Sequence, residues 1–375
     1  MLAINFNEQL KILKLNFNSI SVDLLFEKYY STGFIYKAKE ELLEPYKPTI
    51  LINWQKLLNS KDQLLWIFTT NKHAAHFASV CAWRNTNFGV LAQHLVSEGN
   101  PFMSLRLMLA AQIKAAQCES PTLVHASQNW YRQDNRYAHR IFSSMVKKLG
   151  PLKSSMKLFY LLKLPIEPVK ASENTEFIHA NVTGIDASLI DFVDQQFGRV
   201  FTQAEELDRE DICQTALSKK YKDCGLLNTR KVIKIIDKKT NQIKACLIAN
   251  RASIGINFSF IENRAYYIVD KNLSEEDKRK VVSIMNEEAQ KIYKGIAINY
   301  VPITTEEHTA KVLQSQGAEY IRQYVQSIWL RTGFDQWYDH INSFLQKIEG
   351  REVKIQTSKA YRNSAEYDLV EPTEN

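Results

Sequence analysis

The sequence predicts an α+β protein made of two successive copies of one domain, each a mixed, mostly antiparallel sheet flanked by helices. One element order is expected twice, over roughly 170 residues each time. A segment with prolines at 165 and 168 separates the two runs. The predicted division is an N-terminal domain at 1–165, a linker at 166–176, a C-terminal domain at 177–350 and a polar tail at 351–375.

In the first copy the hydrophobic spacing predicts alternating strands and helices. Residues 10–18 are expected to form a strand, and Ser21 to cap a helix that carries Leu24, Leu25 and Tyr29 on one face. The next helix, at 35–43, is expected to end before Pro45 and Pro48. The remaining elements are strands at 64–69, 74–83 and 88–96, a helix at 102–117, a strand at 122–127, a helix at 135–149 and a strand at 155–164.

The second copy follows the same order. Its expected elements are a strand at 177–183, helices at 187–197 and 211–221, strands at 231–237, 244–250 and 265–269, a helix from Ser274 to about Tyr293, a strand at 296–301, a helix at 305–314 and a strand at 320–331. A terminal helix is expected at 334–347. Glu275 and Glu276 in the first turn favour the helix that Ser274 caps.

Composition indicates a folded protein. The chain has 375 residues, of which 45% are hydrophobic and 24% charged, enough for two domains with their own cores. No apolar run reaches the ~18 residues of a membrane span and no leader pattern stands at the N-terminus, so a cytoplasmic location without a membrane span is expected. The cysteines are widely spaced and odd in number, which favours free thiols: Cys81, Cys118, Cys213, Cys224 and Cys246.

Charge is divided unevenly between the copies. Residues 1–170 hold 21 Lys and Arg against 11 Asp and Glu, whereas residues 171–375 hold 27 against 30. Within 84–163 the ratio is eleven to three. An anionic ligand is therefore expected at the N-terminal copy, although a solvated basic face would give the same counts.

The stretch 88–150 has the form of an anion site. A strand ends in the turn Ser97-Glu98-Gly99-Asn100-Pro101 and leads directly into a helix. The first backbone N–H groups of such a helix lack helical partners and favour a phosphate.

The element order resembles the GNAT (Gcn5-related N-acetyltransferase-like) superfamily. Two stretches resemble its fourth-helix pattern of a polar residue, Ala three positions later, an apolar or Tyr position and a final Gly. These are 135–142 with Gly150, and 307–317, which contains Ala310. The resemblance implies binding of acyl-coenzyme A, with an acetyl or longer chain, and transfer of the acyl group to a small-molecule or peptide amine.

The superfamily's R/Q-x-x-G-x-G/A loop is missing from both copies. The N-terminal turn has one glycine, and its counterpart Asp270-Lys271-Asn272-Leu273-Ser274-Glu275-Glu276 has none. The three carboxylates there would repel a pyrophosphate, which leaves the N-terminal turn as the only plausible cofactor loop in the chain.

Candidate residues cluster beside that loop. The residues expected to contact the cofactor are Ser97, Gly99, Asn100, Arg106, Asn135 and Arg136. Tyr137, then Tyr131, are the expected proton donors, and Glu98 is a candidate general base. The alternatives are a turn residue or a half-buried aromatic at a helix start for Asn135 and the tyrosines, and a helix cap for Glu98.

A metal site is not expected. His73 and His76 lie three positions apart on a predicted strand and so face opposite ways, and neither they nor His125 and His139 have a Cys or carboxylate that completes a set. The tract 130–137 interleaves aromatic residues with arginines, a composition that suits base stacking and phosphate contacts or an ordinary domain interface.

Three functions are compatible with these features. The first is an N-acyltransferase that uses acyl-coenzyme A through its N-terminal copy, with a structural or substrate-binding C-terminal copy. The second is a non-catalytic binding or regulatory protein that keeps the fold. The third is a transferase that takes an aminoacyl group from tRNA, since tandem GNAT-like domains also resemble the Fem-type aminoacyltransferases and the N-terminal half is basic.

Overall fold

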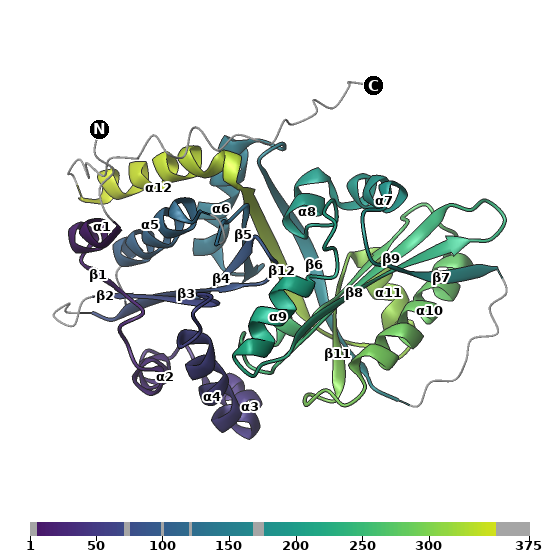
Figure 1. Ribbon diagram of the computed structural model, residues 1–375, viewed down its shortest axis with the longest axis horizontal. Helices are drawn as coiled ribbons and strands as arrows, with labels where there is room; N and C mark the ends of the chain where they lie inside the picture. Colours follow the sequence, from purple (N-terminus) through teal and green to yellow (C-terminus); the bar gives the residue numbers. More distant parts are fainter. Residues whose placement is uncertain (1–5, 71–75, 99–100, 120–121, 168–175, 350–375) are drawn as a thin grey trace.

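One continuous sheet runs through both halves of the chain in the computed structural model. The structure describes residues 6–70, 76–98, 101–119, 122–167 and 176–349. Within these ranges the sheet has twelve strands, in the order β1-β2-β3-β4-β5-β12-β6-β11-β10-β9-β8-β7 (Figure 1). The predicted tail at 351–375 and residues 168–175 of the predicted linker lie outside the described ranges.

The N-terminal half contains the elements up to β6. They are α1 (Phe6–Leu13), β1 (Leu15–Phe17), α2 (Val22–Ser31), α3 (Lys37–Leu43), the 3-10 turn η1 (Glu44–Tyr46), α4 (Lys47–Leu58), β2 (Leu65–Thr70), β3 (Ala78–Arg84), β4 (Gly89–Ser97), α5 (Pro101–Gln117), β5 (Ala126–Arg132), α6 (Arg136–Leu149) and β6 (Ser154–Pro165).

The C-terminal half repeats this order. Its elements are β7 (Phe177–Val182), α7 (Ala187–Phe197), α8 (Arg199–Ala204), α9 (Thr215–Asp223), β8 (Asn228–Asp237), β9 (Ile243–Ala252), the 3-10 turn η2 (Ile261–Asn263), β10 (Ala265–Val269), α10 (Glu275–Tyr293), β11 (Tyr300–Thr305), α11 (Glu307–Ser315), β12 (Glu319–Leu330), the 3-10 turn η3 (Arg331–Gly333) and α12 (Phe334–Glu349).

The two halves exchange their last strands. β12, from the C-terminal half, pairs with β5 of the N-terminal half, and β6 pairs with β11 of the C-terminal half. β12 and β6 also pair with each other, antiparallel, from Glu319 opposite Lys163 to Trp329 opposite Ser154. Each half therefore completes the sheet of the other, and the centre of the sheet belongs to both.

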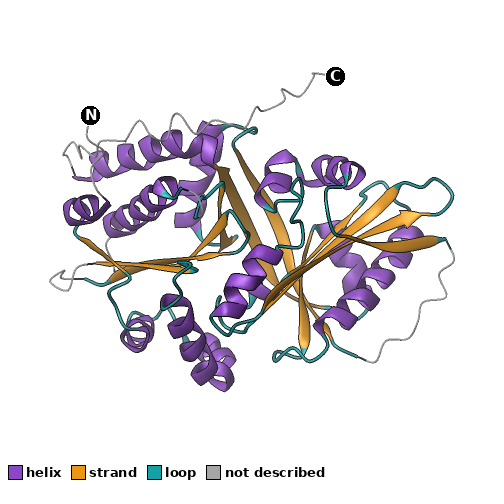
Figure 2. Ribbon diagram, in the orientation of Figure 1, coloured by secondary structure: helices purple, strands orange, loops and turns teal. Residues whose placement is uncertain are grey.

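Helices cover both faces of this sheet (Figure 2). In the N-terminal half α1, α5, α6 and α12 pack on one face over a core that includes Leu107, Met145 and Trp337, all buried. Helices α2 and α4 pack on the opposite face in a second core, which continues beneath α10 of the C-terminal half. Among the described helices none combines the length and the apolar character needed to cross a bilayer.

Most predicted elements are present. The bounds of α7 and β10 match the prediction, and the predicted strands at 64–69, 88–96 and 155–164 correspond to β2, β4 and β6. Ser21 and Ser274 cap α2 and α10 as predicted, accepting hydrogen bonds from the backbone N–H groups of Leu24 and Asp277.

Some bounds were wrong for identifiable reasons. Residues 10–13 are helical, because Phe6, Leu10 and Leu13 fall at helical spacing against α5. Pro48 lies in the first turn of α4, where proline is tolerated, so it does not end a helix there. β5 begins four residues later than the predicted 122 and extends to Arg132, because its polar residues pair with β12 on one side.

Candidate active site in the N-terminal half

The site begins where two parallel strands separate. β4 and β5 pair only over four positions, from Gly89 opposite Ala126 to Ala92 opposite Asn129. Both strands continue beyond this point, to Ser97 and Arg132, without pairing to each other. A gap therefore opens between them inside the sheet.

A β-bulge lies at the same point of β4. The pairing with β3 runs to Gln93 opposite Cys81 and resumes at Val96 opposite Ser79, so that His94 and Leu95 together face Val80. His94 has a left-handed backbone, with φ of 52°. Because a bulge bends its strand and increases its local twist, it turns β4 away from β5 directly after their last paired residues.

A cavity of about 510 Å³ occupies the gap and reaches both faces of the sheet. On the side of α5 and α6 its lining includes Leu95, Ser97, Met108, Tyr131, Tyr137 and Phe142. On the opposite side it includes Phe34, Lys39, Ser259, Arg322 and Tyr324. An opening at each face would let two substrates meet inside the sheet.

Four of the predicted site residues come together at this cavity. Ser97, Tyr131, Asn135 and Tyr137 all contribute to its lining on the side of α5 and α6. Asn135 also caps α6, since its Oδ1 accepts a hydrogen bond from the backbone N–H of Ala138 at 3.1 Å. The start of α6 is thereby fixed at the cavity edge.

The other predicted residues lie elsewhere or are not described. Gly99 and Asn100 lie outside the described residues. Arg106 donates to the carbonyl of Leu13 at 3.1 Å and lies over the ring of Phe102. Glu98 accepts a hydrogen bond from the backbone N–H of Phe77 at 3.0 Å, across the β3–β4 hairpin. Arg136 is an exposed residue of the first turn of α6.

The two tyrosines differ in how their hydroxyl groups are engaged. Burial raises the pKa of Tyr137, and a hydrogen bond with Ser104 partly opposes this. Burial likewise raises the pKa of Tyr131, whose hydroxyl lies 3.4 Å from His139 Nδ1 and 3.3 Å from the sulfur of Met156. Both phenols stay protonated at neutral pH, as a proton donor requires. As a whole residue Tyr137 is 39% exposed, whereas Tyr131 is buried.

His94 is a lining residue that the sequence did not reveal. Its ring stacks 4.0 Å from Phe258, and its Nε2 accepts a hydrogen bond from the backbone N–H of that residue at 3.3 Å. Burial lowers the pKa of His94, so the ring is neutral and the proton sits on Nδ1. Within the described structure this Nδ1 has no hydrogen-bond partner. The bulge thus places the Nδ1–H of His94, a hydrogen-bond donor without a partner in the described structure, at the cavity.

A loop from the C-terminal half forms one wall of the cavity. Residues 253–261 follow β9 and reach across to the bulge, where Gln93 donates to the carbonyl of Ile256 at 2.6 Å and accepts from Asn257 at 2.6 Å. Trp54 of α4 donates to the carbonyl of Gly255 at 2.7 Å. The site therefore depends on both halves of the chain.

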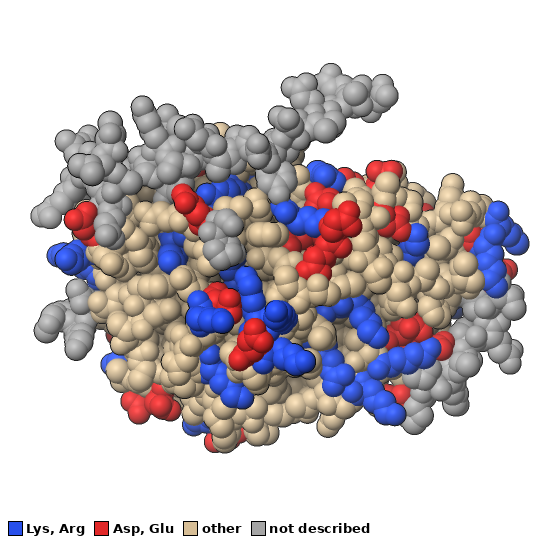
Figure 3. Space-filling view, viewed as in Figure 1, with Lys and Arg blue, Asp and Glu red and all other residues tan. Residues whose placement is uncertain are grey.

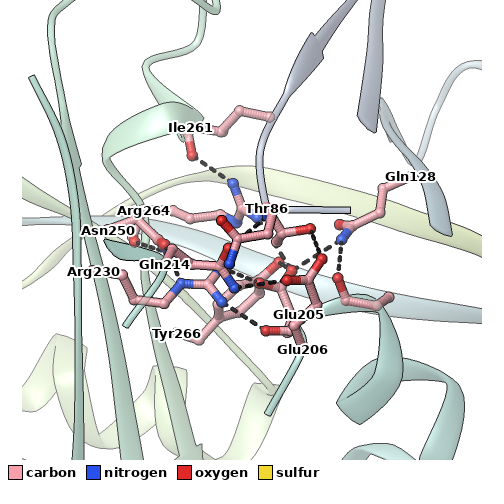
Figure 4. Close-up of polar contacts among 12 residues, drawn as sticks. Thr86, Gln128, Glu205, Glu206, Gln214, Arg230, Asn250, Ile261, Arg264 and Tyr266 are labelled. Carbon is pink, nitrogen blue, oxygen red and sulfur yellow. Dashed lines mark hydrogen bonds and ion pairs between the residues drawn. The ribbon is translucent and has the colours of Figure 1, made fainter. Parts of the chain in front are cut away.

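A buried charged network fixes the other end of β4 (Figure 4). Glu206 accepts hydrogen bonds from Thr86 Oγ1 at 2.7 Å and from the backbone N–H of Phe88 at 2.6 Å, which holds the β3–β4 turn. Its neighbour Glu205 forms ion pairs with Arg230 at 2.6 Å and Arg264 at 3.3 Å. Burial alone would raise the pKa of Glu205, but the two guanidinium groups hold it below its usual value.

The corresponding place in the C-terminal half is bridged by side chains, although β10 and β11 also pair over only three positions, from Ala265 opposite Ile303 to Tyr267 opposite Thr305. A hollow of about 470 Å³, whose lining includes Tyr160, Lys271 and His308, lies beside the bridge. β10 pairs with β9 without a bulge, from Ala265 to Val269. The Thr305 hydroxyl donates to the carbonyl of Tyr267 at 2.7 Å, and His308 Nε2 lies 3.3 Å from the carbonyl of Val269. These contacts bridge β10 to the end of β11 and the start of α11, where the N-terminal half has its cavity.

Each half thus contains a strand, helices, three antiparallel strands, a helix, a parallel strand, a helix and an exchanged last strand. This order of elements, present twice, resembles that of the GNAT superfamily. Phe142 occupies the apolar or Tyr position of the GNAT fourth-helix pattern and lines the cavity. Its side chain carries no hydroxyl. Among the described residues no group of three or more His, Cys, Asp or Glu is placed to hold a metal ion.

Comparison with known proteins gives similarity at the level of structure. No family model and no curated protein matches the sequence. A Drosophila protein from structural genomics has 12% identity and a TM-score of 0.40, over 84% of this chain and 98% of that chain. A tandem GNAT protein from the clavulanic acid biosynthesis pathway has 10% identity and a TM-score of 0.38, over 84% and 98%.

Saccharomyces cerevisiae N-myristoyltransferase, with bound myristoyl-CoA and inhibitors, has 10% identity and a TM-score of 0.35, over 84% of this chain and 80% of that chain. These TM-scores are low, so the fold assignment rests on the order of elements and strands described above.

Proposed function

We propose that the chain is an N-acyltransferase whose N-terminal half binds acyl-coenzyme A and transfers the acyl group to an amine. The observation that carries the proposal is the two-sided cavity between β4 and β5. A transferase needs its donor and acceptor to meet with the reacting atoms in contact, and a passage through the sheet brings them together from opposite faces.

The lining residues suit such a ligand. Asn129 Oδ1 and His94 Nδ1 are buried polar atoms at the cavity without a hydrogen-bond partner in the described structure, and a bound ligand would satisfy them. The turn after Ser97, the start of α6 at Asn135, and Arg106 and Arg136 remain the proposed cofactor contacts. An acyl-coenzyme A would supply the acyl group as a thioester.

The chain's own groups then have the following roles. His94 Nδ1–H, fixed by stacking and by the Phe258 hydrogen bond, donates toward the carbonyl oxygen on which negative charge develops. As the amine nitrogen forms its bond to carbon, the carbon–sulfur bond breaks and Tyr137 gives its proton to the departing thiolate. The proton lost by the amine restores the phenol through water. Tyr131 is the second candidate for this donor.

The C-terminal half is structural in this proposal. It bridges its own gap with Thr305 and His308, carries three acidic residues in the first turn of α10, and supplies a wall to the N-terminal cavity. Glu98 remains a candidate base only through water, because its carboxylate is engaged with Phe77 and it does not line the cavity.

Release of free thiol tests the proposal. Acetyl- and myristoyl-coenzyme A are incubated with the full chain and a panel of amino acids, polyamines and short peptides, and thiol formation is followed. We expect amine-dependent thiol release that Tyr137→Phe reduces. Acyl-coenzyme A binding without turnover of any amine would instead favour a non-catalytic binding protein, a function that Phe142 and the single glycine of the loop also fit.

The face shown in Figure 3 does not favour a tRNA-dependent aminoacyl transfer. On the face shown in Figure 3, basic and acidic side chains are interspersed, whereas a tRNA-binding surface gathers positive charge over an extended area. Retention of activity at high salt would agree with the small substrate that the cavity fits.

A further inference from the structure

The cavity end that faces away from α5 and α6 is strongly positive. Lys39 from α3, Arg132 from β5 and Arg322 from β12 all line it. Of the described residues that line the cavity, none is Asp or Glu. Three cationic side chains from three separate elements therefore line one end of the cavity, and no carboxylate is among its described lining residues.

The backbone places these cations on one face of the sheet. Arg132 lies opposite Tyr324 in the pairing of β5 with β12, and Arg322 lies two residues before Tyr324 on the same strand. Side chains at such positions point to the same side. Lys39 Nζ donates to Ser259 Oγ at 3.2 Å, and the Tyr324 hydroxyl donates to the same oxygen at 2.8 Å. The loop 253–261 thereby holds Lys39 beside the strand cations.

The positive charge is largely uncompensated. Within the described residues no salt bridge joins Lys39 or Arg322 to a carboxylate, and Arg132 contacts only the exposed Asp134, at 3.4 Å. Burial first, and then the charges of Arg322 and Arg132, together lower the pKa of Lys39 to about 8. Positive groups held together in a partly buried space attract an anion strongly, because an anion relieves their repulsion.

We propose that the amine acceptor carries an anionic group, a carboxylate or a phosphate, that binds to Lys39, Arg132 and Arg322. The inference rests on the proposed function, in which the acceptor enters from this face while the cofactor enters beside Ser97 and Asn135. Guanidinium groups pair with both anions through parallel hydrogen bonds. Trp130 Nε1, buried at the same cavity without a partner in the described structure, is a further donor for the anion.

Matched pairs of amines test the inference. The full chain is assayed with acetyl-coenzyme A and β-alanine against propylamine, and with phosphoethanolamine against ethanolamine. We expect kcat/KM to favour the more anionic member of a pair by on the order of 10- to 100-fold, the range that charge-assisted hydrogen bonds support. The pair with the larger ratio distinguishes a carboxylate from a phosphate.

Variants connect this preference to the cations. Arg322→Gln and Lys39→Gln should each remove most of the kcat/KM preference for the anionic amine. The affinity for acetyl-coenzyme A, measured by calorimetry, should stay unchanged. Lys37→Gln is the control, because Lys37 is exposed on the same helix and does not line the cavity. Variants that lose acetyl-coenzyme A affinity but keep the preference would show that the cations bind the cofactor phosphates, which overturns the inference.

The two proposals fail in different ways. Thiol release at equal rates with anionic and neutral amines would overturn the inference and leave the proposed function standing. Absence of thiol release with every amine would overturn the proposed function. In that case a rise in melting temperature with phosphoethanolamine or β-alanine alone, abolished by Arg322→Gln, would still support the anion site, and no rise would overturn it.

Discussion

The two halves of this protein share one element order but differ at the parallel strands in their centres. In the N-terminal half a bulge at His94 turns β4 away from β5, and a cavity of about 510 Å³ fills the gap. In the C-terminal half β10 has no bulge, and Thr305 and His308 bridge the corresponding place. In this chain the cavity therefore coincides with a bulge in β4 that β10 of the C-terminal half lacks, and both halves share the order of elements.

The largest expected effect comes from breaking the buried ion pairs of Glu205 in the C-terminal half. Glu205→Ala leaves Arg230 and Arg264 buried without their carboxylate, which should lower the free energy of unfolding by about 3–5 kcal/mol. Urea denaturation measures the change. Glu307→Ala removes an exposed ion pair with Lys311 and is the control that should leave the midpoint unchanged. Equal midpoints for both variants would mean that these buried ion pairs add nothing to the stability of the fold.

Filling the cavity between β4 and β5 should remove the proposed cofactor site, so that neither half binds acetyl-coenzyme A. Ala138 lines the cavity and is 7% exposed, so Ala138→Phe places a ring in the space proposed for the acyl-coenzyme A. We expect acetyl-coenzyme A to bind at least about 100-fold more weakly, or ~2.7 kcal/mol. His308→Ala, which loosens the C-terminal gap, should leave the affinity unchanged. Calorimetry on both variants checks this, and thermal unfolding shows whether they fold.

Phenylalanine variants of Tyr137 and Tyr131 test which of the two is the proton donor in the N-terminal half. Tyr137→Phe should lower kcat by about 10- to 100-fold with little change in KM, because a proton donor acts in the transition state. Tyr131→Phe should change kcat less, since that hydroxyl already contacts His139 and Met156. A larger loss in Tyr131→Phe would reverse the order of the two candidates.

The smallest effect concerns the loop by which the C-terminal half reaches the cavity. Burial raises the pKa of Glu262 to about 8, and this carboxyl accepts a hydrogen bond from the backbone N–H of Gly255 at 2.7 Å. The folded state therefore favours the protonated form, so its stabilising contribution is complete below pH of about 4.5 and declines as the pH rises through about 8.

Glu262→Gln should flatten this dependence. Melting temperatures recorded between pH 5 and pH 9 would show a decline in the wild type that is shallower in the variant. Parallel curves would mean that Glu262 does not titrate in this range.

Much of the fold could be predicted from the sequence, because most strands and helices have clear hydrophobic periodicity. The repeated order, the caps at Ser21 and Ser274 and the extents of α7 and β10 follow from local patterns. The exchange of β6 and β12 could not be predicted, since strand order depends on pairing between residues far apart in the chain. The predicted bounds of β5 were too early in the chain, because its polar residues Gln128 and Asn129 are buried in the sheet and do not look like strand residues in the sequence.

The site could be predicted only in part. Tyr131, Asn135 and Tyr137 are near one another in sequence, and they lie at one cavity with Ser97 at the end of β4. His94 was missed because a histidine in a strand carries no sign of a bulge. The contribution of Asn257, Ser259 and Arg322 was missed because it comes from the other half through the exchanged strand and the loop 253–261. These contacts are tertiary and leave no local pattern.

The stoichiometry of acetyl-coenzyme A binding tests the central claim most directly. Titration calorimetry on the full chain should give one site per chain, lost in Ala138→Phe and retained in His308→Ala. Two sites per chain, or one site that survives Ala138→Phe and is lost in His308→Ala, would contradict the account, because the C-terminal gap would then be the one that binds the cofactor.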